Sequence, residues 1–572
     1  MDIIIRGGTV IDGTGQPGFA ADVGLKDGKI QAIGVINETA AEEIDARGKI
    51  VIPGFVDIHT HYDGQATWDS HIAPSSWHGV TTVLMGNCAV GFAPCKAEDR
   101  ERLIELMEGV EDIPRAAMHE GLDWTWRTFP EFLDRLDRTP HDIDIAALLP
   151  HAALRVYVMG ERATHKEKAT PEDIQRMREI AREAMQAGAF GFSTSRHMSH
   201  RTLAGEYIPT LRAAEEELTA IATGVQEAGA GLFEFISDWD CPSAKAEFEL
   251  IKRIVEQTRV PVLFSMPQRH SRVGDFDELL ALSDRTAAEG LPIRPVIAPR
   301  PVGVLLGLQG SQNPFSGCPS YKAIAHLPFA ERAKAMSDPE LRARILSEDP
   351  LKENTFPLAE QLKYHWMFPF GEPIDYEPTP AKSLEAIAAR EGRTAPEVAY
   401  DFLISDEGRN FLLAPISNYA NVNLDFFGEA LRHPNTLLGL GDGGAHVGFV
   451  CDASFTTFLL THWGRDRKDG RFPLTELVRR QTSDTADAMG LHDRGRIGVG
   501  KKADINVIDF DKLKLLRPYI VNDLPAGGKR LMQKAEGYVA TIKSGVVIAR
   551  NGEPTGALPG VILRGGPVLD IS

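Results

Sequence analysis

The sequence predicts an α/β fold whose centre is a (β/α)₈ TIM-type barrel. Three observations lead to this prediction. The chain has 572 residues, and a single hydrophobic core rarely includes more than about 250–300 residues. Eight apolar runs of strand length alternate with helical segments, which is typical of parallel βα architectures. Both chain ends carry short strand patterns with turn signals, which adds a smaller sheet domain to the barrel.

The two β-rich blocks cover residues 2–52 and 503–552. In the first block Asp12 and Asp27 are each followed by glycine, a pair that favours tight hairpin turns because glycine tolerates positive φ angles. The second block repeats this alternation of short apolar runs and turns. We therefore expect both chain ends to share one sheet domain.

The eight candidate barrel strands are short apolar runs at residues 54–58, 81–85, 145–149, 189–192, 231–236, 260–264, 293–297 and 436–440. The segments 171–187, 215–228 and 276–288 between them carry apolar residues at spacings of three and four and are predicted helices. In such a barrel, reactive side chains follow the C-terminal ends of the strands.

The gap between the seventh and eighth strands is far longer than an ordinary αβ connection. Residues 304–410 are therefore predicted to be a helical insertion, with helices at 328–336, 339–347 and 381–391. We interpret it as a lid or substrate-shaping element. An equally open interpretation is that the insertion only extends the surface or forms a subunit contact, since long insertions cost little loop entropy.

Composition and charge exclude several classes of protein. With 62 basic and 80 acidic residues the formal charge is −18, which disfavours binding to nucleic acid or to an anionic membrane surface. No window approaches the ~18 continuous apolar residues of a membrane span, and the N-terminus does not resemble a signal peptide. Five scattered cysteines argue against a disulfide framework. We expect a cytoplasmic protein that acts on a small-molecule substrate and has no nucleic-acid or membrane partner. The sequence is also compatible with assembly into a homo-oligomer.

A His-x-His motif, His59 and His61, follows the first candidate strand. In an extended segment both side chains point the same way, so two neutral imidazoles can converge on one divalent ion. The spacing alone is a weak signal. Its place at the C-terminal end of a barrel strand strengthens the prediction.

Asp442 follows the eighth candidate strand, which neighbours the first in a closed barrel. It could be a metal ligand and also the general base that takes a proton from attacking water. The alternative is an ordinary Asp-Gly turn without chemistry.

Longer motifs connect these residues to a known family. They are residues 7–13, 52–61, 78–88, 187–194 and 495–504. With them the chain resembles the amidohydrolase superfamily, and within it the N-acyl-D-amino-acid deacylase (D-aminoacylase-like) branch. The resemblance spans nearly the whole chain. It implies that the sheet domain is a β-sandwich and that the reaction is metal-assisted hydrolysis of an amide bond.

The resemblance also implies a ligand set. His59, His61, Cys88 and Asp442 match the zinc ligands of such deacylases, with Asp442 also the catalytic residue. Two further histidines are missing, because Ser237 and Met266 stand near the places expected after the fifth and sixth strands. His270 or Asp238 could replace them by a local shift. Cys88 could instead be a small buried residue, and the other cysteines are taken as structural. A single Zn²⁺ ion is favoured over two.

Substrate recognition is predicted from residues after other strands. Arginine grips a carboxylate through two parallel hydrogen bonds, so Arg196, Arg269 and Arg300 are substrate-binding candidates. His151 and His197 could donate to a developing oxyanion or support the site from behind, and His446 could orient Asp442. Aromatic residues of the insertion, Tyr364, Trp366 and Phe368, could line an acyl pocket or pack in a core.

These observations predict a metal-dependent hydrolase that cleaves an N-acyl amino acid, with the D configuration as the default. Two alternatives stay open: a hydrolase of small peptides or cyclic amides, and a catalytically silent binding or assembly protein on the same fold. The predicted domains are an N-terminal sandwich part (1–53), the barrel with its insertion (54–485) and a C-terminal sandwich part (486–572).

Overall fold

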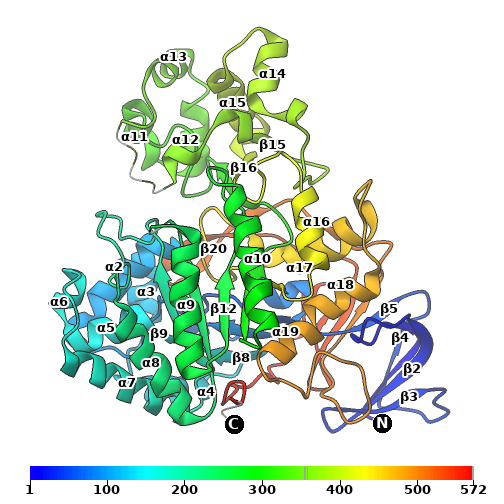
Figure 1. Cartoon of the computed structure of the whole chain (residues 1–572). Coiled ribbons are helices and arrows are strands. Elements are labelled where there is room, and N and C mark those ends of the chain that lie inside the picture. The colour runs from blue at the N-terminus through cyan, green and yellow to red at the C-terminus, as the bar shows by residue number, and fades with distance from the viewer. Residues whose placement is uncertain (241, 353, 355, 357, 570–572) are drawn as a thin grey trace.

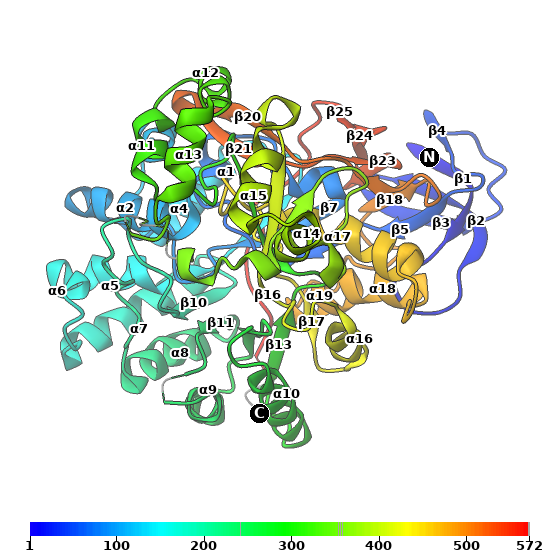
Figure 2. The same cartoon turned by 90° about the horizontal axis from the view of Figure 1, so that it is seen from above.

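The computed structural model describes residues 1–240, 242–352, 354, 356 and 358–569. At its centre lies a barrel of parallel strands, seen from the side in Figure 1 and from above in Figure 2. Each of the eight predicted runs overlaps an observed strand. These are β6 (Phe55–Asp57), β7 (Val80–Met85), β8 (Asp144–Ala147) continued by β9 (Leu149–Pro150), β10 (Gly191–Arg196), β11 (Leu232–Ser237), β12 (Val262–Ser265), β13 (Ile293–Ile297) and β17 (Leu437–Leu438).

Parallel pairing joins these strands in chain order. The first and the eighth strand meet just beyond their C-terminal ends, where Thr60 forms a parallel bridge with Gly443. There the amide of His61 donates to the carbonyl of Gly443 at 2.7 Å, and the amide of Asp442 donates to the carbonyl of His59 at 3.2 Å. This backbone pairing closes the barrel and brings the loops after its first and last strands together.

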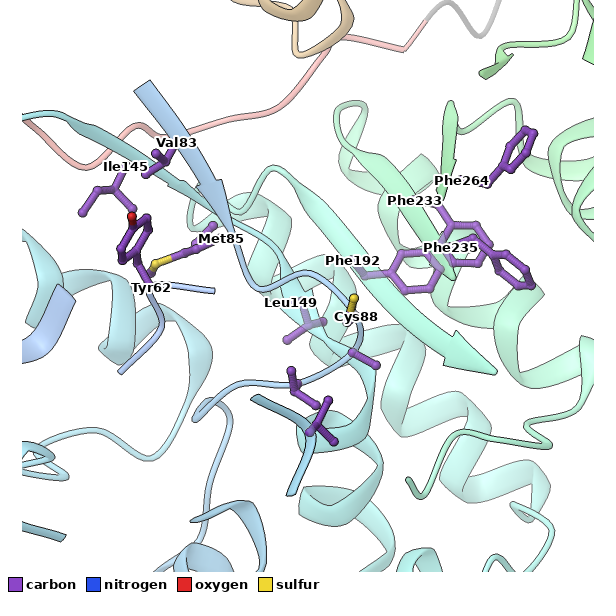
Figure 3. Close-up of a cluster of buried hydrophobic side chains, with 14 of the residues drawn as sticks. Tyr62, Val83, Met85, Cys88, Ile145, Leu149, Phe192, Phe233, Phe235 and Phe264 are labelled. Atoms are coloured by element: carbon purple, nitrogen blue, oxygen red, sulfur yellow. The ribbon is translucent and has the colours of Figure 1, made fainter. Parts of the chain in front are cut away.

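The barrel interior is an apolar core to which successive strands contribute, with Val56, Leu84, Leu232 and Leu263 among its members. Because side chains alternate between the two faces of a strand, Glu234 shares the inward face of β11 with Leu232. Phe233 lies on the opposite face of β11. Its ring stacks on that of Phe192 from β10, with the ring centroids 4.2 Å apart (Figure 3).

Three predicted helices are confirmed within two residues: α7 (Pro171–Gln186), α8 (Glu215–Ala228) and α10 (Gly274–Ala288). The other α-helices outside the insertion are α1 (Gln65–Trp68), α2 (Arg100–Glu111), α3 (Arg115–Gly121), α4 (Phe129–Asp137), α5 (His151–Met159), α6 (Glu161–Thr164), α9 (Ala244–Thr258), α16 (Asp425–Arg432), α17 (Phe455–Phe458), α18 (Leu474–Gln481) and α19 (Ser483–Ala488). Among the described residues, no helix is long and apolar enough to cross a membrane.

Both chain ends contribute to one nine-stranded sheet of the β-sandwich domain, as predicted. Its strands are β1 (Ile3–Val10), β2 (Phe19–Lys26), β3 (Lys29–Gly34), β4 (Glu42–Asp45), β5 (Ile50–Pro53), β18 (Ile505–Ile508), β23 (Tyr538–Lys543), β24 (Val546–Arg550) and β25 (Glu553–Pro554). The two ends join where β18 pairs antiparallel with β5, with Val507 opposite Val51. Smaller two-stranded sheets are formed by β19 (Lys514–Leu515) with β22 (Ala535–Glu536) and by β20 (Tyr519–Leu524) with β21 (Gly528–Met532).

The last described residues leave the sandwich and run along the barrel. The amide of Leu563 donates to the carbonyl of Ile145 at 2.8 Å, and the amide of Gly231 donates to the carbonyl of Pro567 at 2.9 Å. This segment therefore contacts the third and fifth barrel strands near their N-terminal ends. The predicted division of the chain at residues 53 and 485 stays a prediction.

The insertion between the seventh and eighth barrel strands contains the three predicted helices and more (Figure 1). Its helices are α11 (Pro319–Ala325), α12 (Phe329–Ala335), α13 (Pro339–Ser347), α14 (Leu384–Glu391) and α15 (Ala395–Ile404), and its sheet consists of β14 (Val302–Gly307), β15 (Phe368–Phe370) and β16 (Phe411–Ser417). Leu306, Met336, Leu384 and Tyr400 belong to an apolar core separate from that of the barrel. The insertion therefore has a core of its own, and its sheet also contributes Leu305, Phe368 and Leu413 to the main core.

His78, at the end of the short helix η1 (Ser75–His78), makes folding stability depend on pH. Its Nδ1 lies 2.8 Å from Oγ1 of Thr457, and its Nε2 lies 2.9 Å from the carbonyl oxygen of Gln533. Burial lowers the pKa of His78 to about 4. The stability that neutral His78 contributes is present above the ordinary histidine pKa of about 6.5 and is lost as the pH falls toward about 4, because only the unfolded chain takes up the proton.

We expect this single group to lower the free energy of unfolding by about 2 kcal/mol between neutral pH and about pH 5. Urea unfolding of the wild type and of His78→Gln at both pH values isolates the contribution of His78. The variant should be less stable at neutral pH but should lose less stability on acidification. An equal loss in both proteins would contradict the prediction.

Candidate active site

The four predicted metal ligands converge beyond the C-terminal ends of the barrel strands. His59 and His61 follow β6, Cys88 lies in the loop after β7 (Figure 3), and Asp442 follows β17. Nε2 of His59 lies 3.5 Å from Sγ of Cys88 and 3.4 Å from Oδ1 of Asp442. Nε2 of His61 lies 3.8 Å from the same oxygen.

One ligand atom each from His59, His61 and Cys88 lie within 4.8 Å of one another. Around a tetrahedral zinc ion with ordinary bond lengths, neighbouring ligand atoms are about 3.3–3.8 Å apart. The two imidazoles and the thiol therefore lie close enough together for a zinc-sized ion, and Oδ1 of Asp442 lies 3.4 and 3.8 Å from the imidazoles. That these residues bind a metal stays a prediction.

The cluster is buried and its backbone is unusual. His59 and His61 are each 2% exposed and Cys88 is 5% exposed. Cys88 and Asp442 have φ angles of 54° and 46°, in the left-handed region that side chains other than glycine seldom adopt. Such backbone geometry is often found at functional sites, where the surrounding structure holds it in place.

The electrostatics of the cluster follow from burial and from neighbouring charges. Burial lowers the pKa of His59 to about 4 and raises that of the Cys88 thiol well above its ordinary value. Burial also disfavours a charged His61, but the carboxylates of Glu111 and Asp442 outweigh it and raise the pKa of His61 to about 9. Metal binding would therefore have to displace protons from His61 and Cys88.

Two buried carboxylates beside the histidines were not predicted. Oε1 of Glu111, at the end of α2, lies 3.4 Å from Nδ1 of His61. Oε1 of Glu234, on the inward face of β11, lies 3.8 Å from Nδ1 of His59. Burial raises the pKa of Glu234 to about 8. A charged residue in the middle of an apolar barrel strand could have signalled Glu234, whereas the sequence around Glu111 gives no comparable signal.

The cluster opens into a cavity of about 590 Å³. The barrel contributes His59, His61, Cys88 and Asp442 to its lining. The insertion contributes Phe356, Leu358, Gln361, Lys363 and Trp366. This arrangement supports the interpretation of the insertion as a substrate-shaping element.

The three predicted aromatic residues of the insertion lie in different places. Trp366 lines the cavity, and its ring lies 4.2 Å from that of His270. Phe368 is buried in the main core instead, and Tyr364 packs against the core of the insertion. Only Trp366 of these three therefore faces the cavity.

The structure brings one of the three predicted substrate-binding arginines to the cavity. Arg269 lines it and forms an ion pair with Asp275. Arg196 does not, because it lies on the outward face of β10, opposite to Ser193 and Ser195, and its guanidinium group donates to both oxygens of Glu247 on α9 at 2.8 and 3.1 Å.

Arg300 also points away from the cavity. It is 2% exposed and donates to Oδ1 of Asp452 at 2.6 Å, and its guanidinium group lies over the ring of Tyr376. The loop after β13 turns this side chain toward the segment that follows the eighth strand. The assignments of Arg196 and Arg300 as substrate contacts are therefore corrected.

Of the three histidines predicted to support the site, His197 and His446 line the cavity and His151 does not. His151 does not line the cavity, because its ring nitrogens pair with Thr194 and Glu217 at 2.8 and 2.9 Å. His197 lines the cavity, with its Nε2 3.1 Å from Oδ1 of Asp238. His446 also lines it.

His446 was predicted to orient Asp442, but its Nε2 lies 3.7 Å from Oε2 of Glu111. His446 therefore faces Glu111, a residue that was not predicted from the sequence.

The places of the two missing histidines hold other groups. Ile236 and Ser237, at the end of β11, both line the cavity, and Oγ of Ser237 donates to Glu247 at 3.0 Å. Met266 is buried after β12. Asp238 and His270, the suggested substitutes, line the same cavity, where Asp238 pairs with His197 and Nε2 of His270 accepts from the amide of Tyr419 at 3.2 Å. Neither belongs to the group of ligand atoms that His59, His61 and Cys88 form.

The remaining cysteines that the structure describes are buried free thiols: Cys95, Cys318 and Cys451. Cys241 lies outside the described residues.

The fold and the site together define a barrel hydrolase with a candidate metal centre at the C-terminal ends of its strands. The sequence profile of the amidohydrolase family matches residues 42–549. A D-aminoacylase of Alcaligenes xylosoxydans xylosoxydans is 27% identical over 515 residues, which cover 89% of this chain and 88% of that protein. An N-acyl-D-aspartate deacylase of the same organism is 37% identical over 197 residues, 34% of this chain and 36% of that protein.

Among solved structures, an N-acyl-D-glutamate deacylase from Bordetella bronchiseptica, in complex with zinc and a phosphonate inhibitor, aligns with a TM-score of 0.64 at 25% identity. The alignment covers 99% of both chains. The chain belongs to the amidohydrolase family, within its D-aminoacylase-like branch. The predicted fold, a TIM-type barrel with a β-sandwich domain, is confirmed.

Proposed function

We propose that this enzyme hydrolyses the amide bond of an N-acyl amino acid, with the D configuration preferred, and that it uses one Zn²⁺ ion. The observation that carries the proposal is the group formed by His59, His61 and Cys88, whose ligand atoms lie within 4.8 Å of one another, with Oδ1 of Asp442 3.4 and 3.8 Å from the two imidazoles, beside a cavity of about 590 Å³. The deacylase names of the relatives support the substrate class. A homo-oligomeric state stays a prediction.

The donor set fits zinc. His59 and His61 supply imidazole nitrogens, Cys88 supplies sulfur and Asp442 supplies a carboxylate oxygen, all of which are ordinary zinc ligands. When bound, such an ion lowers the pKa of a coordinated water toward about 7 and polarises a carbonyl group.

Asp442 is the group best placed to move the proton. In the proposed reaction its carboxylate accepts a proton from the attacking water and returns it to the nitrogen of the leaving amine as the C–N bond breaks. Its Oδ1 lies 3.4 and 3.8 Å from the Nε2 atoms of His59 and His61, and the residue lines the cavity, which supports this role.

The cavity supplies candidate binding groups for both ends of the substrate. Arg269 is the arginine that could pair with the carboxylate of an amino acid, since a guanidinium group offers several donors beyond its pair with Asp275. Phe356, Leu358 and Trp366 offer an apolar wall for the acyl group.

Metal removal tests the catalytic part of the proposal. We expect about one equivalent of zinc per chain and loss of hydrolysis after treatment with a chelator, because the attacking water is then no longer activated. Restoring zinc should restore activity. Metal analysis and turnover are measured on the same samples, and full activity in metal-free protein would contradict the proposal.

The substrate class is tested with a panel of N-acyl-D-amino acids, N-acyl-L-amino acids, dipeptides and cyclic amides on zinc-reconstituted protein. We expect the highest kcat/KM for an N-acyl-D-amino acid. Faster hydrolysis of a dipeptide or cyclic amide would replace the proposed substrate but keep the hydrolase. Zinc binding without turnover of any compound would favour a binding protein on the same fold.

A further inference from the structure

Glu111 and Glu234 lie beside the ring nitrogens of His61 and His59 that face away from the predicted ligand point. We propose that they are positioning residues: Glu111 holds His61, and Glu234 holds His59 and Cys88, so that the donor atoms face one metal ion. The inference rests on the proposed function in one respect, that a metal ion binds this cluster. The identity of the substrate does not enter it.

Each imidazole presents its two nitrogens to different groups. In both His59 and His61, Nε2 faces Oδ1 of Asp442. Nδ1 of His61 faces Oε1 of Glu111 at 3.4 Å, and Nδ1 of His59 faces Oε1 of Glu234 at 3.8 Å. A proton on Nδ1 that is drawn toward a carboxylate leaves the Nε2 lone pair for a metal ion.

Glu111 lies between two histidines. It is 1% exposed, and its Oε2 lies 3.7 Å from Nε2 of His446, a residue of the loop that also carries Asp442. Neither Nδ1 of His61 nor Oε2 of Glu111 has a hydrogen-bond partner among the described residues.

Glu234 connects the fifth strand to two predicted ligands. It is 3% exposed, and its Oε2 accepts a hydrogen bond from the amide of Cys88 at 3.1 Å, which anchors a residue with a left-handed backbone. Its Oε1 faces His59 and has no hydrogen-bond partner among the described residues. This strand offers Ile236 and Ser237, not an imidazole, to the cavity, so its charged contribution beside the centre is the carboxyl group of Glu234.

The charges give a second reason for this assignment. Asp442, Glu111 and Glu234 place three carboxyl groups around two imidazoles in a buried region. Burying carboxylates without full pairing costs free energy. A divalent cation beside the imidazoles offsets that cost, so retaining Glu111 and Glu234 is favourable when the centre is loaded.

Zinc affinity, measured without substrate, tests the inference. Glu111→Gln and Glu234→Gln keep the size of the side chain and replace its carboxyl group with an amide, which cannot carry a negative charge beside a metal ion. We expect each to raise the Kd for zinc by about 10–100-fold, as is typical when a carboxylate behind a metal-ligating histidine is lost. The Kd is determined by competition with a chromophoric chelator, and the visible spectrum of the Co²⁺-loaded protein reports on the ligand geometry.

Glu217→Gln is the matched control. Glu217 is also a buried glutamate whose Oε1 lies 2.9 Å from a histidine, His151, but this pair does not line the cavity. Its substitution should leave the zinc Kd and the Co²⁺ spectrum unchanged. If a glutamine variant does not fold, the aspartate variant withdraws the carboxylate by one methylene and should also weaken zinc binding.

Wild-type zinc affinity in the Glu111 and Glu234 variants overturns this inference alone. So does an equal loss of affinity in Glu217→Gln, since the effect would then not be specific to these two residues. A wild-type protein that binds no zinc overturns both the inference and the metal part of the proposed function. Zinc binding that depends on both glutamates, without hydrolysis of any acyl amino acid, supports the inference and overturns only the proposed substrate.

Discussion

Asp442→Asn is expected to lower kcat by about 10²–10⁴-fold, the usual contribution of a positioned general base. Asparagine has nearly the shape of aspartate, but its amide cannot take a proton from water at neutral pH. The carboxylate lies 3.4 Å from His59 and 3.8 Å from His61, so the substitution also removes one predicted ligand. Steady-state kinetics on the preferred N-acyl amino acid measures the effect.

Metal content separates the two roles of Asp442. If the variant retains zinc and loses turnover, proton transfer is the main loss; if zinc is also lost, ligation contributes. Asp284→Asn is the control. Asp284 is an exposed aspartate that pairs with His433 and does not line the cavity, so this variant should keep wild-type kinetics. Activity of Asp442→Asn within a few-fold of wild type would exclude Asp442 as the base.

The second large effect is expected on stability, at a buried ionic cluster where the sandwich meets the barrel. Asp144, on the third barrel strand, lies 2.5 Å from Nζ of Lys502, 2.6 Å from Nη1 of Arg494 and 2.9 Å from Nζ of Lys543. Asp144 and Lys543 have fully buried side chains. Asp144→Ala leaves these cations without their shared partner, and we expect a loss of about 3–5 kcal/mol in the free energy of unfolding.

Chemical denaturation followed by circular dichroism and tryptophan fluorescence measures this loss. The control is Asp45→Ala, which removes an exposed ion pair with Arg47 and should cost less than about 1 kcal/mol. A loss below about 1 kcal/mol for Asp144→Ala would show that the cluster contributes little to joining the two parts.

The sequence predicted the parts of the fold that depend on local pattern. Barrel strands appear as short apolar runs because both of their faces are buried, and helices such as α8 repeat apolar residues at spacings of three and four. The insertion was harder, because α11 to α15 separate β14 from β16 in the sequence. Their pairing is set by contacts distant in the sequence.

In the candidate site too, placements that follow from local pattern were predictable and those that depend on tertiary packing were not. His59, His61 and Asp442 were predictable because strand ends place them, and the closed barrel brings the first and last strands together. Arg196 was misassigned because alternation along β10 turns it outward to Glu247. Glu111 reaches the site from the end of a helix, a placement that depends on tertiary packing and left no pattern in the sequence.

The separate core of the insertion has a consequence for how this enzyme could change. The four predicted metal ligands belong to the barrel, whereas Phe356, Leu358 and Trp366 belong to the insertion, which has an apolar core of its own. Substitutions or grafts in that unit could therefore alter which acyl chains are accepted without disturbing the catalytic apparatus. Chain-length selectivity and turnover chemistry are thus open to independent engineering.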